Sequence, residues 1–361
     1  MSVRREWEDL RRTRSNRPGE AGKSEDRGET FAAALEQAEQ LFAAAGGVGP
    51  AASPLLLFYG ISQLGRALAA ASPRLAKDEY RLKGHGIESP QASWENGTLD
   101  GVKTRSASAK NPGAFQRVAQ VVQACAFESQ PRLLADLIDL VSLIDSGIDN
   151  NFRLPKNPPL NLSPTADGSV MPQMSIGPIP MSVYVAGVPR SIIPHESGVA
   201  LDDPLDPDSE WPGNTARERL TCFFDSYPTL RGWKLLTNEP DSLVSRRYLP
   251  PRYDVMQILL TLPLYDGERS LPTPERFTVD GIEVAMACPD GCGLPDHPLT
   301  LWWALLHSLS MLARYAPREW RRIIDVDTSP DAVRVEQILK AAHSTVPQLA
   351  LAVLRSMSTS P

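Results

Sequence analysis

Helical periodicity is strongest near the start of the chain. Between Ser53 and Ala71 the apolar residues recur every three or four positions, which places them on one face of an α-helix. Ser53 can accept a hydrogen bond from a first-turn amide, and Pro54 needs no amide donor at the first helical position. The predicted buried face consists of Leu57, Ile61, Leu64 and Leu68.

The same spacing predicts helices on both sides of this one. The predicted helices are Phe31–Ala45, a helix that starts at Gly113 and carries Phe115, Val118, Val122 and Cys125 on one face, Arg132–Asp145, a helix from Pro298, and two more that begin at Ser329-Pro330 and near Val346-Pro347. The helices at Phe31 and Ser53 are close enough along the chain to pack as an antiparallel pair.

The middle of the chain has a different pattern. From Leu154 to Pro295 the helical period fades, prolines recur, and short strand-like runs appear. These runs are Ser182–Val188, Trp233–Thr237, Val255–Leu262 and Phe277–Ala287. Within the last run, Asp280-Gly281 is a strong signal for a hairpin turn.

We therefore predict an α+β fold that is mainly α, in which a helical bundle is built from both chain ends and a β-containing segment is inserted. The predicted domains are a flexible N-terminal segment (1–28), the first part of the bundle (29–153), a proline-rich insert (154–295) and the second part of the bundle (296–361).

Composition narrows the class of protein. The chain has 361 residues and a formal charge of −6, which disfavours a protein that coats nucleic acid generally. The N-terminus lacks the apolar core of a signal peptide, and the run Leu299–Ala313 is too short and too interrupted to span a bilayer. The four cysteines do not form the pattern of a secreted disulfide framework. These features predict a cytoplasmic protein with no membrane association.

Several segments together resemble the YaaC-like family, whose opening is similar to that of HEPN-like helical domains. They are SPLLLFYGISQLGRALAAASPRLAKDEYRLKGHG from Ser53, Gly113-Ala114-Phe115, QAEQLFAAA from Gln37, and the pattern Ser310-Met311-x-Ala313-Arg314-Tyr315 followed by Pro317-x-x-Trp320. The resemblance spans about residues 37–145 and 296–322. It implies a HEPN-like bundle.

The resemblance also implies a function by analogy of fold. We expect a non-catalytic interaction or nucleic-acid-associated module, working in a bacterial defence or toxin-like system. The partners implied are another protein or a second copy of the chain, and RNA or DNA. No cofactor is expected.

The alternative is a divergent, metal-independent HEPN-type ribonuclease with Arg81 and His85 at its site. A histidine can move the proton of a ribose hydroxyl, and an arginine can stabilise phosphate charge. Catalytic HEPN domains carry an arginine and a histidine with four to six residues between them, whereas only three residues lie between Arg81 and His85. The competing interpretation is structural: the imidazole of His85 hydrogen-bonds loop backbone.

Two further candidate sites compete with simpler interpretations. Cys288, Cys292 and His297 resemble half of a zinc site, but structural zinc needs four ligands, and an exposed loop with incidental thiols explains the cysteines better. Arg314, Arg318, Arg321 and Arg322 lie beside Tyr315 and Trp320. Such a set suits phosphate binding and base stacking, although basic residues also favour the end of a solvated helix.

Overall fold

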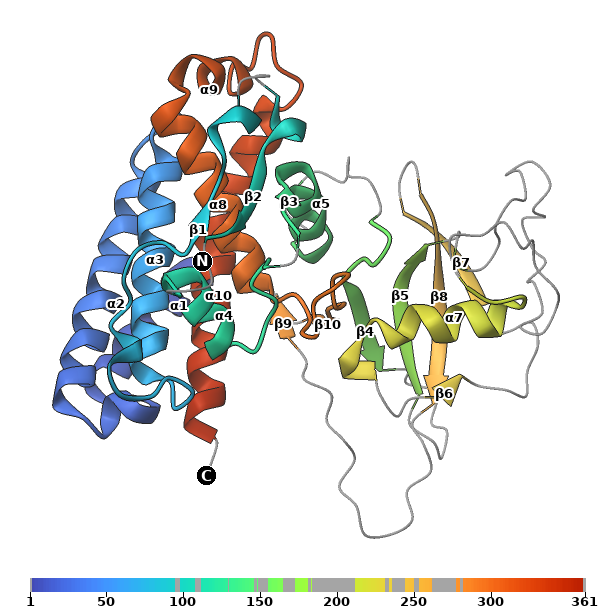
Figure 1. The fold of residues 1–361 in the computed structure, drawn as a ribbon, viewed down its shortest axis with the longest axis horizontal. Coiled ribbons are helices and arrows are strands. Elements are labelled where there is room, and N and C mark those ends of the chain that lie inside the picture. The colour runs from blue at the N-terminus through green and yellow to red at the C-terminus, as the bar shows by residue number, and fades with distance from the viewer. Residues whose placement is uncertain are drawn as a thin grey trace. The chain divides into compact units, whose positions relative to one another are not determined.

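Both ends of the chain supply helices to one unit in the computed structural model (Figure 1). This helical unit comprises Met1–Phe152 and Asp290–Pro361, and the intervening Arg153–Pro289 form a second unit, called here the sheet unit. The structure describes residues 2–94, 98–107, 112–128, 130–145, 148, 155–164, 173–180, 183, 212–230, 234–235, 244–249, 253–261, 277–279 and 282–359.

Long helices build the helical unit. They are α1 (Ser2–Ser15), α2 (Glu25–Gly46), α3 (Ser53–Ala71), α4 (Ala114–Val121), α5 (Leu134–Ile144), α8 (Pro298–Tyr315), α9 (Pro317–Ile323) and α10 (Ala332–Thr359). Short 3-10 turns connect some of them: η1 (Gly19–Gly22), η2 (Lys77–Tyr80), η3 (Gln91–Ser93) and η4 (Leu99–Gly101). Helix α3 packs against α2, α8 and α10, so the blue N-terminal helices lie beside the orange and red C-terminal ones in Figure 1.

The centre of the unit is apolar and closely packed. The predicted face of α3 is buried, as are Trp302 and Trp303 of α8. A side chain at Gly65 of α3 would place its Cβ 2.3 Å from the ring of Trp303, so the indole lies directly against the helix backbone. Truncating an aromatic side chain in such a core costs about 3–5 kcal/mol, which indicates how strongly this contact holds α3 and α8 together.

A small antiparallel sheet lies in the helical unit. Strands β1 (Ile87–Glu88), β2 (Lys103–Ser106) and β3 (Arg132–Leu133) pair in the order β1-β2-β3. Ile87 pairs with Ser106, and Thr104 pairs with Arg132. The strand or hairpin arm expected at Thr98–Arg105 corresponds to β2.

The sheet unit contains a larger antiparallel sheet. Its described strands run in the order β6-β8-β5-β4-β10-β9, and β7 also pairs with β8. The bounds are β4 (Leu160–Pro164), β5 (Gln173–Pro180), β6 (Lys234–Leu235), β7 (Val244–Leu249), β8 (Tyr253–Thr261), β9 (Phe277–Val279) and β10 (Ile282–Ala285), with α7 (Ala216–Asp225) and η5 (Pro228–Leu230) between strands. Val279 pairs with Ile282 as the predicted hairpin requires, although Asp280-Gly281 lie outside the described residues, as does most of Ser182–Val188.

The prediction of a mainly helical α+β fold is confirmed, but three segments differ from expectation. The segment before residue 29 is largely helical rather than flexible: it holds α1, η1 and the start of α2, and Trp7 and Leu10 of α1 are buried in the unit. Helix α4 ends at Val121, and Gln123 adopts a left-handed φ of 52°, so Cys125 follows the helix instead of lying on its face. Pro347 lies inside α10 and does not begin a new helix.

In the described part of the chain, no helix combines the length and the apolar character that a membrane span needs.

Candidate functional site

The loop that carries His85 is shaped by its two glycines. Gly84 and Gly86 have φ values of 61° and 72°, in the left-handed region that suits glycine. A Cβ at Gly86 would lie 2.8 Å from the carbonyl carbon of Gly113, so the two backbones touch. This close approach places the loop at the start of α4.

The loop backbone caps α4. The carbonyl of His85 accepts a hydrogen bond from the amide of Phe115 at 2.9 Å, and the carbonyl of Gly84 accepts one from Ala114 at 3.3 Å. First-turn amides of a helix have no partner within the helix, so these bonds satisfy donors that would otherwise be unpaired. The loop is therefore fixed by main-chain atoms.

The structural interpretation of His85 must be corrected. The side chain is exposed, and its imidazole makes no hydrogen bond within the described part of the chain. The ring packs instead against Phe58 and Tyr59, with centroid distances of 5.2 and 6.5 Å. The backbone of His85 holds the loop, and its side chain is left available at the surface.

Two arginines act on this imidazole. Partial burial lowers the pKa of His85, and the positive charges of Arg66 and Arg314 lower it further. Arg66 donates to the carbonyl of Leu82 at 2.8 Å, and Arg314 donates to the hydroxyl of Tyr59 at 3.4 Å. Neither arginine forms an ion pair with a carboxylate among the described residues. No carboxylate in the described part of the chain therefore neutralises their charge.

Exposed tyrosine rings accompany these charges. Tyr59 is 39% exposed and Tyr315 is 53% exposed. The guanidinium of Arg314 lies 4.9 Å from the centroid of the Tyr315 ring, and that ring stacks on Trp94 at 6.0 Å. We call Tyr59, Arg66, His85, Arg314 and Tyr315 the arginine–tyrosine surface.

The other predicted arginines lie just beyond it in the chain. Arg318, Arg321 and Arg322 are exposed on α9, which begins two residues after Tyr315, and none has an ion pair within the part that the structure describes. The structure thus brings two predicted site residues, His85 and Arg314, to one surface.

Behind Phe58 lies a buried polar cluster. The ring of His307 is 5.1 Å from that of Phe58, and its Nδ1 lies 3.3 Å from Oγ of Ser89. Ser89 and Ser308 both hydrogen-bond Thr104, joining β2 to α8. Burial lowers the pKa of His307 to about 3, and the nearby His85 lowers it as well, so His307 is neutral at pH 7. This cluster supports the surface from below.

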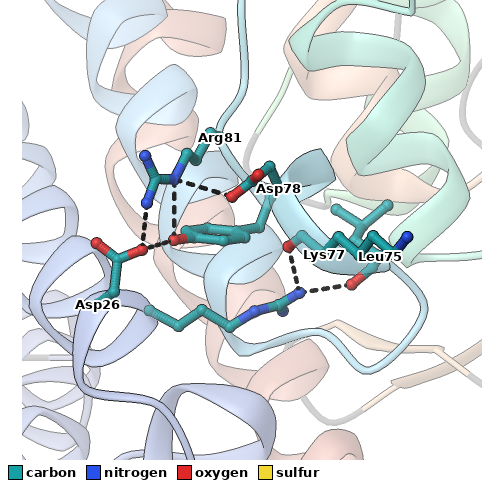
Figure 2. Close-up of polar contacts among 7 residues, drawn as sticks. Asp26, Leu75, Lys77, Asp78 and Arg81 are labelled. Carbon is teal, nitrogen blue, oxygen red and sulfur yellow. Dashed lines mark hydrogen bonds and ion pairs between the residues drawn. The ribbon is translucent and has the colours of Figure 1, made fainter.

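Arg81 belongs to a different set of contacts. Its guanidinium donates to the carboxylate of Asp26 at 2.6 Å and lies 3.4 Å from that of Asp78, as Figure 2 shows. The hydroxyl of Tyr80 also donates to Asp26. The Tyr80 hydroxyl and the Arg81 guanidinium both lower the pKa of Asp26. Arg81 and His85 are therefore not assembled into the pair that the ribonuclease hypothesis requires.

Arg27 lies beside this cluster and is buried. Its guanidinium reaches carbonyls that follow the end of α3, with distances of 2.6 Å to Leu75, 3.1 Å to Ser72 and 3.2 Å to Lys77, and it also lies over the ring of Tyr80. Figure 2 shows the carbonyls of Leu75 and Lys77 converging on one side chain. This arginine satisfies loop carbonyls and is structural.

The three candidate metal ligands are not clustered. Within the described residues, no group of three histidine, cysteine or acidic side chains could hold a metal ion. Nδ1 of His297 accepts the amide of Leu299 at the start of α8, and the amide of Cys288 donates to Ser226 in the sheet unit. Cys292 lies in the loop before α8, next to Cys125.

Sequence reasoning missed Tyr59 and Arg66. Both lie on α3, seven positions apart, which is nearly two helical turns and places them on one side of the helix. The sequence could show only this shared helix side. It could not show that Tyr59 and Arg66 lie near Arg314, because the contact between α3 and α8 joins distant parts of the chain.

Comparison with known proteins gives one informative result. No curated protein and no solved structure matches the chain. The family model described as YaaC-like Protein matches residues 3–173 and 238–354, which is most of the sequence. The chain therefore belongs to the YaaC-like family.

Proposed function

We propose that the helical unit is a non-catalytic module that binds single-stranded nucleic acid on its arginine–tyrosine surface. The observation that carries the proposal is unneutralised charge: Arg66 and Arg314 both act on His85, and no described carboxylate pairs with either arginine. A phosphate group carries the negative charge that would neutralise these arginines, so nucleic acid is a suitable ligand for the surface. Because the net charge is −6, attraction of phosphate has to come from a local positive patch such as this one.

The tyrosines favour a single strand over a duplex. Unpaired bases can stack on exposed aromatic rings, and arginine can contact phosphate and ring faces at once. Tyr59 and Tyr315 both touch Arg314, so stacking and phosphate contacts would share one side chain. The proposal also takes the bundle to be HEPN-like and places it in a bacterial defence or toxin-like system, on the analogy of fold.

The test is binding of the full chain to fluorescently labelled single-stranded RNA and DNA, measured by anisotropy. Arg314→Ala should weaken binding by about 1 kcal/mol, or roughly fivefold, and reduce its salt dependence. Arg355→Ala is the matched control, because it removes the same charge from an exposed arginine that pairs with Asp9 at 3.0 Å. Equal affinity of the wild type and Arg314→Ala would contradict the proposal.

The ribonuclease alternative is supported by one observation. The lowered pKa of His85 leaves its imidazole neutral at pH 7, the form that accepts a proton, next to two arginines that could stabilise phosphate charge. Cleavage of RNA in the presence of a chelator, lost in His85→Ala while binding persists, would favour the nuclease. Binding without cleavage would favour the module.

A further inference from the structure

Two cysteines far apart in the sequence are neighbours in the helical unit. The thiol of Cys292 lies close enough to Cys125 to raise its pKa, and Ala124 and Ala126, on either side of Cys125, line the same cleft as Cys292. The amide of Cys125 also donates to the carbonyl of Pro295 at 2.8 Å, which holds the loop around Cys292 against the residues that follow α4. All four cysteines of the chain are thiols in this structure.

The two thiols differ in their access to solvent. Cys125 is 2% exposed, whereas Cys292 is half-buried and lines an open cleft of about 960 Å³. Arg74, Gln120, Gln123 and Leu294 also line the cleft. A small solute can therefore reach Cys292 from the cleft, and Cys125 lies behind it.

The loop that carries Cys292 can adjust. Gly291 and Gly293 flank the cysteine, and an added Cβ at Gly293 would have no atom within 4 Å. The loop is anchored beyond this point by Asp296, whose carboxylate accepts two hydrogen bonds from Arg132 at 2.7 and 3.0 Å. Disulfides demand specific geometry, so a glycine-flanked cysteine with space around it meets that demand more easily than a cysteine in a helix.

We propose that Cys292 and Cys125 form a peroxide-oxidised disulfide pair, with Cys292 as the reacting thiol and Cys125 as the resolving thiol. The Cys292 thiolate attacks hydrogen peroxide, a sulfur–oxygen bond forms, the oxygen–oxygen bond breaks, and the hydroxide that leaves takes up the proton released when Cys292 ionised, which gives the first water. The sulfur of Cys125 then attacks the sulfenic acid, the sulfur–sulfur bond forms, and the sulfenic oxygen leaves as water with the Cys125 proton. Two electrons pass from the thiols to one peroxide, which yields two waters.

The order of roles follows from the surroundings of the two sulfurs. Burial raises the pKa of Cys125 to about 12, and the neighbouring Cys292 raises it further. Cys125 therefore keeps its proton and reacts slowly with peroxide in solution, because the thiolate is the nucleophile. Cys292 reacts first, and its oxidised sulfur is then attacked by the neighbouring Cys125.

The test uses the full chain, reduced and then treated with hydrogen peroxide. Remaining thiols are blocked by alkylation, and the protein is digested and examined by mass spectrometry without reductant. We expect a peptide that joins Cys125 to Cys292 and is lost on addition of dithiothreitol. A bond from Cys292 to Cys288 instead, or oxidation of Cys292 to sulfinic acid with Cys125 still reduced, would overturn the proposal.

Variants separate the two roles. Cys292→Ser should lose the joined peptide while keeping a melting temperature close to that of the wild type, since its side chain is only half-buried. Cys125→Ser should accumulate a Cys292 sulfenic acid that dimedone traps. Cys222→Ser, in α7 of the sheet unit, should form the Cys125–Cys292 bond as the wild type does. Trapping of sulfenic acid at Cys125 in Cys292→Ser, to the extent seen at Cys292 in Cys125→Ser, would reverse the assignment.

Discussion

Two groups of arginines in the helical unit differ in what their charges meet. Arg27 and Arg81 reach four backbone carbonyls and two carboxylates between them. Among the described residues, Arg66 and Arg314 reach one carbonyl and one phenol. The first group is satisfied by the protein itself, and the second meets no described carboxylate at a surface with exposed aromatic rings.

The difference separates structural cations from cations available to a ligand. Both groups contain an exposed arginine near a tyrosine, so exposure and residue type do not distinguish them. For the two exposed arginines, Arg81 and Arg314, the distinguishing feature is whether a described carboxylate from a distant segment lies within reach, as Asp26 does for Arg81. Charge balance therefore identifies the arginine–tyrosine surface more reliably than an arginine–histidine spacing along the chain.

The largest effect that this comparison predicts concerns Arg27. Arg27→Ala should lower the free energy of unfolding by on the order of 3 kcal/mol, because buried carbonyls lose their donor. Denaturant unfolding measures the loss. Affinity of the folded protein for single-stranded RNA should not change. A stable Arg27→Ala protein with weakened RNA binding would break the distinction between the two groups.

A second effect distinguishes buried from exposed histidine. Burial lowers the pKa of His307 to about 3, against about 6.5 in an unfolded chain. Between these values the unfolded chain binds a proton that the folded protein does not. The contribution to stability is therefore complete above pH 6.5 and is lost as the pH falls toward 3.

At pH 5 the free energy of unfolding is lower by about 2 kcal/mol because of His307, since each pKa unit corresponds to about 1.36 kcal/mol. The measurement is the free energy of unfolding at pH 7 and pH 5. His307→Asn should reduce the difference between the two pH values, whereas His85→Asn, at an exposed position, should change it much less. The same dependence in His307→Asn and the wild type would show that His307 is protonated in the folded protein.

The smallest expected effect is that of Arg81. Arg81→Ala removes an ion pair whose side chains are 56% and 60% exposed, and such surface pairs contribute little to stability. We expect a melting temperature close to that of the wild type and unchanged binding to RNA. Loss of RNA binding or cleavage in Arg81→Ala, but not in Arg314→Ala, would show that the functional site lies at Arg81 and not at the arginine–tyrosine surface.

Local patterns predicted the helices well, because a helix buries residues at a spacing visible within a few turns. Leu57, Ile61, Leu64 and Leu68 are buried as the periodicity of α3 requires. The same reasoning failed for α1, where two buried residues, Trp7 and Leu10, lie among many charges. It also failed at Pro347, because burial of Val346, Leu349 and Ala350 on both sides keeps α10 continuous.

The candidate site was only partly predictable. His85 and Arg314 stood out by residue type, but their proximity depends on the packing of α3 against α8. No sequence pattern identifies Tyr59 and Arg66 as site residues before that packing is known. The role of the His85 carbonyl was hidden for a similar reason: its partner, Phe115, lies on another element, and no side-chain pattern records a main-chain bond.

The packing of α3 against α8 and α10 has a consequence during synthesis of the protein. A ribosome that has completed α1–α3 must still translate Arg153–Pro289 before α8 emerges, which takes on the order of ten seconds. Throughout that interval the apolar face of α3 has no final partner from the C-terminal helices. The nascent chain should therefore be a substrate for ribosome-associated chaperones, and release of arrested chains that end before Pro298 should yield aggregates.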